Sequence, residues 1–358
     1  MTLRLSPHWL AAIATVWLAG AGACAPAAAP AAAPAPAAAP ANAAAQPAPA
    51  AQPPPKTDVT LRLPWFARGY DAPYYVALTK GLYDEAGLNV EIREGQGSVR
   101  TLAALDAGQE TFGSLDAAVL LAGADKGIQS KMTFMFVQRS PNAVIYYPDA
   151  GIHSPQDLRG KSIGTTPGAN VTLLLPLFLD AIGLPRDSVE VTNVDAAGKV
   201  AAFRSHKFDA MTGLTNDQIG ELEADGEQVA SIVFADSGVN TLGMGIVARN
   251  DFIERNPDVV RRFVAATQQA WDATVRNPDE AVAIIADAYP GYKAAAFKSQ
   301  LAYTIPLLHT KNTEGKPTGW MAREDWDEAN GLLVKSGIIQ QPANVADLYT
   351  NAFIPGSP

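Results

Sequence analysis

The sequence predicts an α/β protein with two lobes, mostly parallel sheets flanked by helices, and a helical C-terminal segment. Short β-rich runs alternate with helical stretches from residue 58, which is typical of a largely parallel sheet. The alternation restarts near residue 141, and a β-rich run at 242–248 leads back to the first set. About 300 residues follow the N-terminal tract, enough for two packed cores. We therefore expect a hinged clamshell, with one lobe from 58–140 plus 241–358 and the other from 141–240.

The first 23 residues predict a secretory signal peptide. Arg4 is the only early charge, the apolar run at 9–18 is too short for a stable membrane anchor, and small residues follow it. The residues before Cys24 resemble a lipobox, although Ala21 stands where leucine is usual, and they also fit a plain A-x-A cleavage site. Cys24 is the sole cysteine, so no internal disulfide can form, which favours the lipid anchor.

Residues 24–57 predict a disordered linker behind the lipidated cysteine. From 25 to 55 there are eighteen Ala and ten Pro among thirty-one positions, and none is charged. Proline at this density favours polyproline II, so the tether could reach about 90 Å.

The net charge of −9 argues against nucleic-acid binding. The four histidines share no ligand-like spacing, so we expect neither a metal nor a cofactor.

Each element is expected where a β-rich run or a helical stretch stands between turn residues. Proline in the first turn marks the helices at 73, 257 and 278, and Gly-Gln-Gly-Ser opens the one at 98. The expected strands are 59–63, 89–93, 112–114, 132–137, 142–147, 162–165, 189–192, 210–212, 229–234 and 242–248. The expected helices are 73–85, 98–107, one from 116, 169–182, 199–205, 217–224, 257–275, 278–288, 294–303 and 323–336.

Six segments, in order along the chain, resemble one protein family. They are APYYVALTKGLYDEAGLNVEI at 72–92, GQGS at 95–98 with Thr101, AG, FG and DAA between 107 and 118, GIHSPQDLRGKSIG at 151–164, PG at 167–168 and FDAMTG at 208–213. Together they are similar to periplasmic substrate-binding proteins that serve ABC importers of nitrate, sulfonates and thiamine-precursor pyrimidines. The resemblance implies a type II periplasmic binding fold, a periplasmic monomer, and an ABC permease and ATPase as partners.

Within that family, the aromatic residues and proline before Tyr74-Tyr75 look most similar to the pyrimidine-precursor and flavin-binding branch. The resemblance therefore implies capture of a small, planar heteroaromatic ligand by closure of the clamshell. An alkanesulfonate, taurine or aromatic acid is the alternative ligand, and an exported enzyme or sensor domain is the alternative class. Fungal pyrimidine synthases share this fold, but their pattern includes a cysteine-rich iron-binding run that this chain does not have. We therefore expect no enzymatic activity.

The stretch LPWFARGYDAPYY at 63–75 raises the question of the site, because it combines five aromatic residues with Arg, Gly, Asp and Pro. It follows the first strand, so it should lie at the ligand side of the sheet, where rings can stack on a heterocycle. Helix starts near 98 and 170 offer free N–H groups, and glycine permits close approach. The candidate ligand-binding residues are Trp65, Phe66, Tyr70, Tyr74, Gly97, Ser98, Asp116, Gly168, Asn170, Thr212 and Asn216.

Several candidates also have a purely structural interpretation. Tyr75 and Tyr83 could belong to the core, and Arg68 could simply pair with Asp71 across the turn. Ser98 and Asp116 could each be an N-cap. Residues 236–240 follow the second unit and are expected to act as a hinge.

Overall fold

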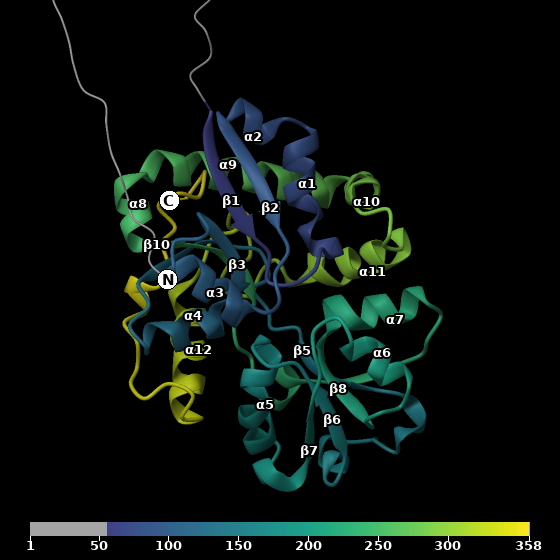
Figure 1. Ribbon diagram of the computed structural model, residues 1–358. Helices are drawn as coiled ribbons and strands as arrows, with labels where there is room; N and C mark the ends of the chain where they lie inside the picture. The colour runs from purple at the N-terminus through teal and green to yellow at the C-terminus, as the bar shows by residue number, and fades with distance from the viewer. Residues whose placement is uncertain (1–55, 358) are drawn as a thin grey trace, which may run out of the picture. The chain divides into compact units, whose positions relative to one another are not determined.

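The computed structural model describes residues 56–357 of the 358-residue chain. The predicted signal peptide, the lipidation at Cys24 and nearly all of the predicted linker lie outside the described residues. Within the described part, ten strands form two five-stranded sheets (Figure 1).

The first sheet has the strand order β2-β1-β3-β10-β4. Its strands are β1 (Thr57–Arg62), β2 (Leu88–Arg93), β3 (Phe112–Asp116), β4 (Ser130–Met135) and β10 (Met244–Arg249). The second sheet has the order β7-β6-β8-β5-β9. Its strands are β5 (Asn142–Tyr146), β6 (Ser162–Thr165), β7 (Glu190–Asn193), β8 (Ala210–Leu214) and β9 (Ala230–Val233).

The prediction of mostly parallel sheets is refined by one reversed strand in each sheet. β10 runs antiparallel to both of its neighbours in the first sheet, and β5 does the same in the second. Each is the first strand after the chain changes sheets, and no α-helix lies between it and the strand before it, although a 3-10 turn (Phe234–Ser237) precedes β10. Only a crossover such as a helix returns the chain to the same direction, so a strand entered directly can run antiparallel.

Most α-helices lie within about three residues of their predicted ends, but α8 (Asn250–Arg255) was not predicted and one predicted helix is divided. The predicted helix 73–85 is two helices, because Gly81 takes a left-handed conformation with φ 73° between them. The α-helices are α1 (Ala72–Thr79), α2 (Leu82–Glu85), α3 (Ser98–Asp106), α4 (Ala117–Ala124), α5 (Asn170–Ala181), α6 (Lys199–Arg204), α7 (Gly220–Ala224), α8 (Asn250–Arg255), α9 (Pro257–Arg276), α10 (Pro278–Ala288), α11 (Ala294–Thr304) and α12 (Arg323–Lys335).

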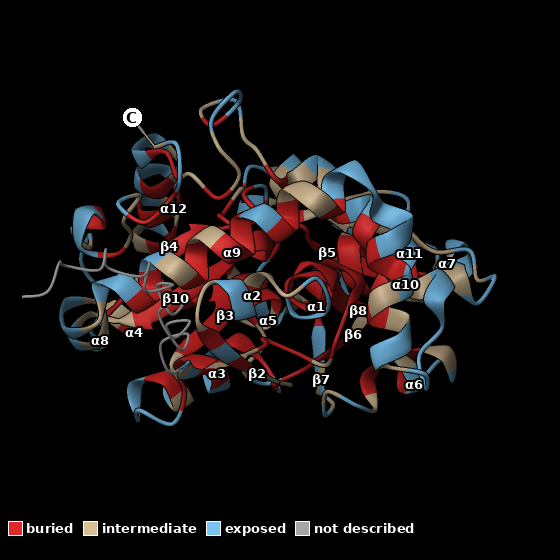
Figure 2. Cartoon of the chain, turned by 90° about the horizontal axis from the view of Figure 1, so that it is seen from above, coloured by how far each residue is buried: buried red, intermediate tan, exposed pale blue. Residues whose placement is uncertain are grey.

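Amphipathic helices cover the core, as α9 illustrates. It buries Val260, Phe263, Val264 and Trp271 on one face and exposes charged residues on the other (Figure 2). Strands β3 and β5 are buried along their whole length, which is expected for central strands covered on both faces. None of the described helices has the length and apolar character needed to cross a membrane.

Two chain segments join the sheets, and they touch. The Thr241 hydroxyl donates to Ser140 Oγ at 3.4 Å, and Asn142 Nδ2 donates to the same oxygen at 2.7 Å. The C-terminal part adds a further connection, because α11 packs against α7, which follows β8 of the second sheet. This contact was not foreseen from the sequence.

Candidate functional site

Residues that follow strands of both sheets line one cavity of about 50 Å³. Its walls come from the turn after β1, the start of α3, the end of β3, the start of α5 and α6, and the turn between β8 and α7. The lining residues are Pro64, Trp65, Tyr70, Gly97, Ser98, Asp116, Ala169, Asn170, Val171, Lys199, Leu214, Asp217, Gln218 and Met244. The volume holds about four water-sized groups.

Trp65 and Tyr70 form the aromatic wall of the cavity, and both side chains are buried. The turn that carries Trp65 is fixed by backbone hydrogen bonds. Gly95 N–H donates to the Trp65 carbonyl at 3.0 Å, and Gly97 N–H donates to the Pro64 carbonyl at 2.7 Å. The backbone that carries the Trp65 ring is therefore fixed by the turn between β2 and α3.

Asp116 supplies a buried carboxylate at the end of β3. It accepts hydrogen bonds from Ser98 Oγ at 2.6 Å and from Asn170 Nδ2 at 3.0 Å. Burial raises the pKa of Asp116 to about 6, although these two hydrogen bonds act in the opposite direction. The carboxylate is thus incompletely compensated, and a ligand donor would stabilise its ionised form.

Asn170, the first residue of α5, links the two sheets and also presents an acceptor. Its Nδ2 reaches Asp116 of the first sheet and Asn142 Oδ1 of the second, at 3.0 and 3.3 Å. Its Oδ1 is buried and accepts no hydrogen bond from any described residue. A buried acceptor without a donor costs about 1–3 kcal/mol, and because Asn170 lines the cavity, a ligand that donates to this oxygen would remove that cost.

Lys199, which the sequence analysis missed, is the cation of the cavity. It is 3% exposed, its Nζ donates to the Thr212 carbonyl at 2.9 Å, and Nζ lies 5.7 Å from the Trp65 ring centroid. Burial lowers its pKa to about 8, while Asp217 and Glu221 act to raise it. One signal existed in the sequence, because a lysine at the first position of a helix opposes the helix dipole.

Arg68 and Asp217 form a buried ion pair between the turn after β1 and the turn after β8. Burial alone would lower the pKa of Arg68, but the carboxylates of Asp217 and Glu221 raise it. The alternative that Arg68 pairs with Asp71 is wrong for the guanidinium group, which pairs with Asp217, and Asp71 instead accepts from the Arg68 backbone N–H at 2.9 Å. Asp217 and Gln218 were also missed. They lie on a π-helical turn (Thr215–Ile219), an irregularity that occurs often at functional sites.

The backbone closes one side of the cavity between α3 and α5. Val99 N–H donates to the Gly168 carbonyl at 3.3 Å, and Gly97 adopts φ 115° beside it. A Cβ at Gly97 would lie 2.7 Å from the Gly168 oxygen. Gly168 is therefore not a lining residue, but it contacts the lining residue Gly97.

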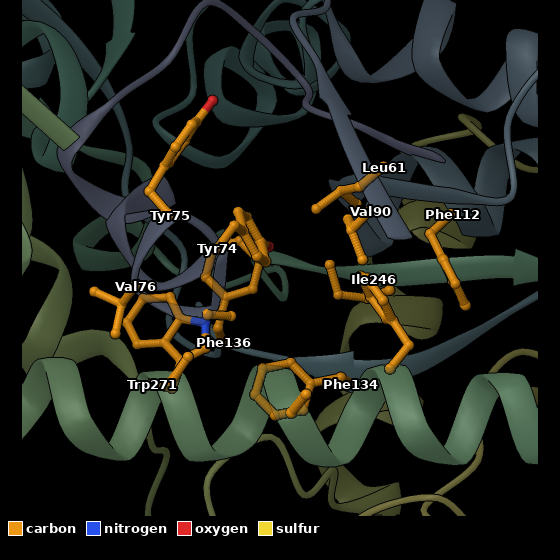
Figure 3. Packing of buried hydrophobic residues seen from close by; sticks show 14 of the residues in the cluster. Leu61, Tyr74, Tyr75, Val76, Val90, Phe112, Phe134, Phe136, Ile246 and Trp271 are labelled. Atoms are coloured by element: carbon orange, nitrogen blue, oxygen red, sulfur yellow. The ribbon is translucent and has the colours of Figure 1, made fainter. Parts of the chain in front are cut away.

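Six of the predicted site residues line the cavity, and the other five do not. Tyr74 lies in the hydrophobic core, packed edge-on against Phe136 beside Trp271 (Figure 3). Phe66 lines three outer hollows of about 340, 380 and 420 Å³ instead. Thr212 points its hydroxyl at the Gly164 carbonyl within the second sheet, and Asn216 donates to Thr304 Oγ1 of α11 at 3.0 Å.

The described residues contain no group of three or more His, Cys, Asp or Glu that could hold a metal ion. The polar side chains of the cavity are two carboxylates, one ammonium group, two amides, one phenol and one hydroxyl. This set can form hydrogen bonds to a small polar ligand from several directions, while Trp65 offers a flat apolar face.

Curated proteins similar to this chain are named mostly as binding proteins. The riboflavin-binding protein RibY of Chloroflexus aurantiacus is 27% identical over 307 residues, covering 83% of this chain and 86% of that protein. The formylaminopyrimidine-binding protein of Halalkalibacterium halodurans is 25% identical, covering 82% and 89%. One relative is named as an enzyme, the 4-amino-5-hydroxymethyl-2-methylpyrimidine phosphate synthase of Legionella pneumophila, at 25% identity with 85% and 94% covered.

Solved structures share the fold. The alkanesulfonate-binding protein SsuA from Xanthomonas axonopodis pv. citri, bound to MOPS, superposes with a TM-score of 0.64 at 16% identity, covering 83% of this chain and 99% of that one. The predicted α/β fold of periplasmic binding proteins is therefore confirmed. The profile of the family described as NMT1/THI5 like matches residues 69–281, more than half of the chain. The chain belongs to this NMT1/THI5-like family.

Proposed function

We propose that this protein is an extracytoplasmic solute-binding protein whose ligand is a small, planar amino-heterocycle such as a thiamine-precursor pyrimidine. The observation that carries the proposal is the pair of buried acceptors, the Asp116 carboxylate and Asn170 Oδ1, on the same cavity as the Trp65 ring. Two adjacent acceptors suit the edge of an amino-heterocycle, which has N–H donors, and the indole suits its face.

The size of the cavity favours one ring over three. About 50 Å³ is far below the space that a tricyclic flavin needs, so a flavin would require a large displacement of the walls. A monocyclic pyrimidine requires the smallest opening. Under this proposal, the relative named for riboflavin and the relatives named for pyrimidines would have the same arrangement of site residues and would differ in the volume of the cavity.

We further propose that binding closes two lobes, with the boundaries predicted from the sequence and with α11 shared between them. The crossing segments around Ser140 and Thr241 would act as the hinge, and the Arg68–Asp217 and Val99–Gly168 contacts would form on closure. The closed monomer would dock on an ABC permease in the periplasm, with Cys24 as a lipid anchor and the Ala/Pro tract as its tether. Periplasmic location is supported by the names and fold of the similar proteins.

Isothermal titration calorimetry on the purified chain from residue 56 onward tests the ligand class. The probes are 4-amino-5-hydroxymethyl-2-methylpyrimidine, riboflavin and taurine. We expect heat and a 1:1 stoichiometry with the pyrimidine, weak or no binding of riboflavin, and loss of pyrimidine binding in Trp65→Ala. Tyr303→Ala is the aromatic control, because Tyr303 is exposed on α11 and does not line the cavity, and it should bind as the wild type does. No heat from the pyrimidine would overturn the proposal.

A sulfonate such as taurine is the second candidate, and Lys199 is the observation that favours it. A buried ammonium group on the cavity wall would attract the sulfonate, and taurine's own amine could face Asp116. The Trp65 ring would then contribute little, since taurine has no flat face. Preference for taurine over the pyrimidine, unchanged by Trp65→Ala, would establish this candidate.

A second alternative is that the protein is an enzyme, because one relative is named as a synthase. It predicts that a bound pyrimidine is chemically changed. Proton NMR of the pyrimidine during prolonged incubation with the protein is the direct test. We expect the ligand spectrum to show exchange broadening only, and new resonances would overturn the non-enzymatic assignment.

A further inference from the structure

Besides the ion-paired Asp217, the cavity wall carries two charged groups of opposite sign, Asp116 and Lys199, each with its own partners. Asp116 is bonded to Ser98 and Asn170, whereas Lys199 donates to the Thr212 carbonyl and lies near Asp217. The two residues belong to different parts of the fold, because Asp116 ends β3 of the first sheet and Lys199 begins α6, which follows β7 of the second sheet. The wall therefore offers acceptors at Asp116 and donors at Lys199.

Lys199 is unusual because it is buried without a counter-ion in contact. Its side chain is 3% exposed, and among the described residues it forms no ion pair within 4 Å and donates one hydrogen bond. An ammonium group has three N–H donors, so two are left for other partners. Burying a charge with unused donors is unfavourable, and a buried charged group on a cavity wall is typical of a binding or catalytic site.

The Arg68–Asp217 pair explains why Asp217 does not neutralise Lys199. Asp217 Oδ1 accepts from Arg68 Nε, and Gln300 Nε2 donates to the same oxygen at 3.2 Å. Gln218 Nε2 donates to the other oxygen at 2.5 Å. With both of its carboxylate oxygens engaged, Asp217 leaves the Lys199 donors for a group inside the cavity.

We propose that Lys199 determines the substrate class of this site, by requiring a ligand that carries an oxygen acceptor or anionic group on the side away from its amino edge. This inference rests on the proposed function and names the ligand further, as a dipolar amino-heterocycle with a hydroxyl, formyl, carboxylate or phosphate substituent. The amino edge meets Asp116 and Asn170 Oδ1, Trp65 covers the ring, and the oxygen accepts from Lys199 Nζ.

The charge state of Lys199 makes the preference pH-dependent. The groups that face Lys199 are Asp217 and Glu221 from the turn and helix after β8, and Arg68, Tyr70 and Trp65 from the turn after β1. Burial lowers the pKa of Lys199 to about 8. Affinity for an anionic ligand should therefore fall as pH rises through 8, whereas a ligand without the oxygen should bind alike at pH 7 and pH 9.

A cycle of paired ligands and paired variants tests the inference. The ligands are 4-amino-2,5-dimethylpyrimidine, which lacks the oxygen, 4-amino-5-hydroxymethyl-2-methylpyrimidine, and the phosphate ester of the latter. Lys199→Met removes the charge at similar length, Lys199→Arg retains it, and Lys207→Met is the control because Lys207 is exposed. Dissociation constants come from calorimetry, and thermal melting reports whether each variant is folded.

We expect Lys199→Met to weaken binding of the two oxygen-bearing ligands at least tenfold and to change binding of the dimethylpyrimidine less than twofold. Its melting temperature should equal or exceed that of the wild type, and Lys207→Met should bind as the wild type does. An equal loss for all three ligands, or no loss for any, overturns the inference while the proposed function stands.

Absence of pyrimidine binding in the wild type defeats the proposed ligand instead. In that case taurine and inorganic sulfate are the deciding probes, measured by the increase in melting temperature. The inference requires that Lys199→Met abolish this increase and that Lys199→Arg retain it. Equal responses of wild type and Lys199→Met to both anions, including no response in either, would refute the role of Lys199.

Discussion

Asp116→Asn should stabilise the free protein in a pH-dependent manner, because the site holds a carboxylate whose ionisation is opposed by burial. The pKa of Asp116 is raised from 3.8 to about 6. A difference of about 2 pKa units corresponds to about 3 kcal/mol. A raised carboxyl pKa means that this penalty is absent below pH 3.8, grows between the two values and is complete above pH 6. The asparagine removes the charge at nearly the same volume.

Urea unfolding of wild type and Asp116→Asn at several pH values between 4 and 7.5 measures the effect. The difference in the free energy of unfolding should rise in favour of the variant by about 3 kcal/mol over this range, with most of the change between pH 4 and 6. All other titrating groups are common to both proteins and cancel. A difference that stays constant with pH would refute the claim that burial destabilises the ionised form of Asp116.

The same variant should bind the pyrimidine more weakly. Weaker binding by a variant that is more stable than the wild type could not be explained by a folding defect.

Two further changes test how the two sheets are joined around the cavity. Arg68→Met should lower stability by about 3 kcal/mol, because it leaves Asp217 buried without its cation, and the double variant with Asp217→Leu should recover most of the loss in thermal melting. Gly97→Ala should weaken ligand binding at least tenfold in calorimetry, because its Cβ would lie 2.7 Å from the Gly168 oxygen. Gly127→Ala is the control, since it has a similar positive φ and no neighbour within 4 Å, and equal effects of the two would contradict the steric argument.

The alternation of β-rich and helical stretches predicted all ten strands to within a few residues, because hydrophobic period and turn residues are local properties. Strand direction is not local. β5 and β10 follow direct connections, and their orientation depends on which neighbours they pair with. The break at Gly81 was also missed, since a single glycine within a helical pattern is usually tolerated and here it is not.

In the site, too, the features that depend on local sequence were predicted and those that depend on contacts between distant segments were not. Trp65, Ser98, Asp116 and Asn170 follow strands or begin helices, and such positions gather at one edge of an α/β sheet, so their type and position pointed to the cavity. Tyr74 has the same chemistry as its neighbours in the turn, but the first turn of α1 directs it into the core. The unfavourable place of Lys199 at the start of α6 was the only local signal for it, and its burial could not be predicted because it results from the packing of α6 against β8.

On the proposed function, the residues that would bind the ligand are also residues that join the two sheets. Ligand binding and closure of the cavity should therefore be coupled. Asn170, a lining residue of the cavity, ties the second sheet to Asp116 with its nitrogen, while its buried oxygen has no partner among the described residues. A ligand that donates to this oxygen also orients the amide that bridges to Asp116. Closure without ligand leaves that oxygen unpaired and the Asp116 charge poorly compensated, at a combined cost of several kcal/mol. On the proposed closure, ligand binding removes both costs at once, so the same few groups that would select the ligand would also favour the closed form when it is present.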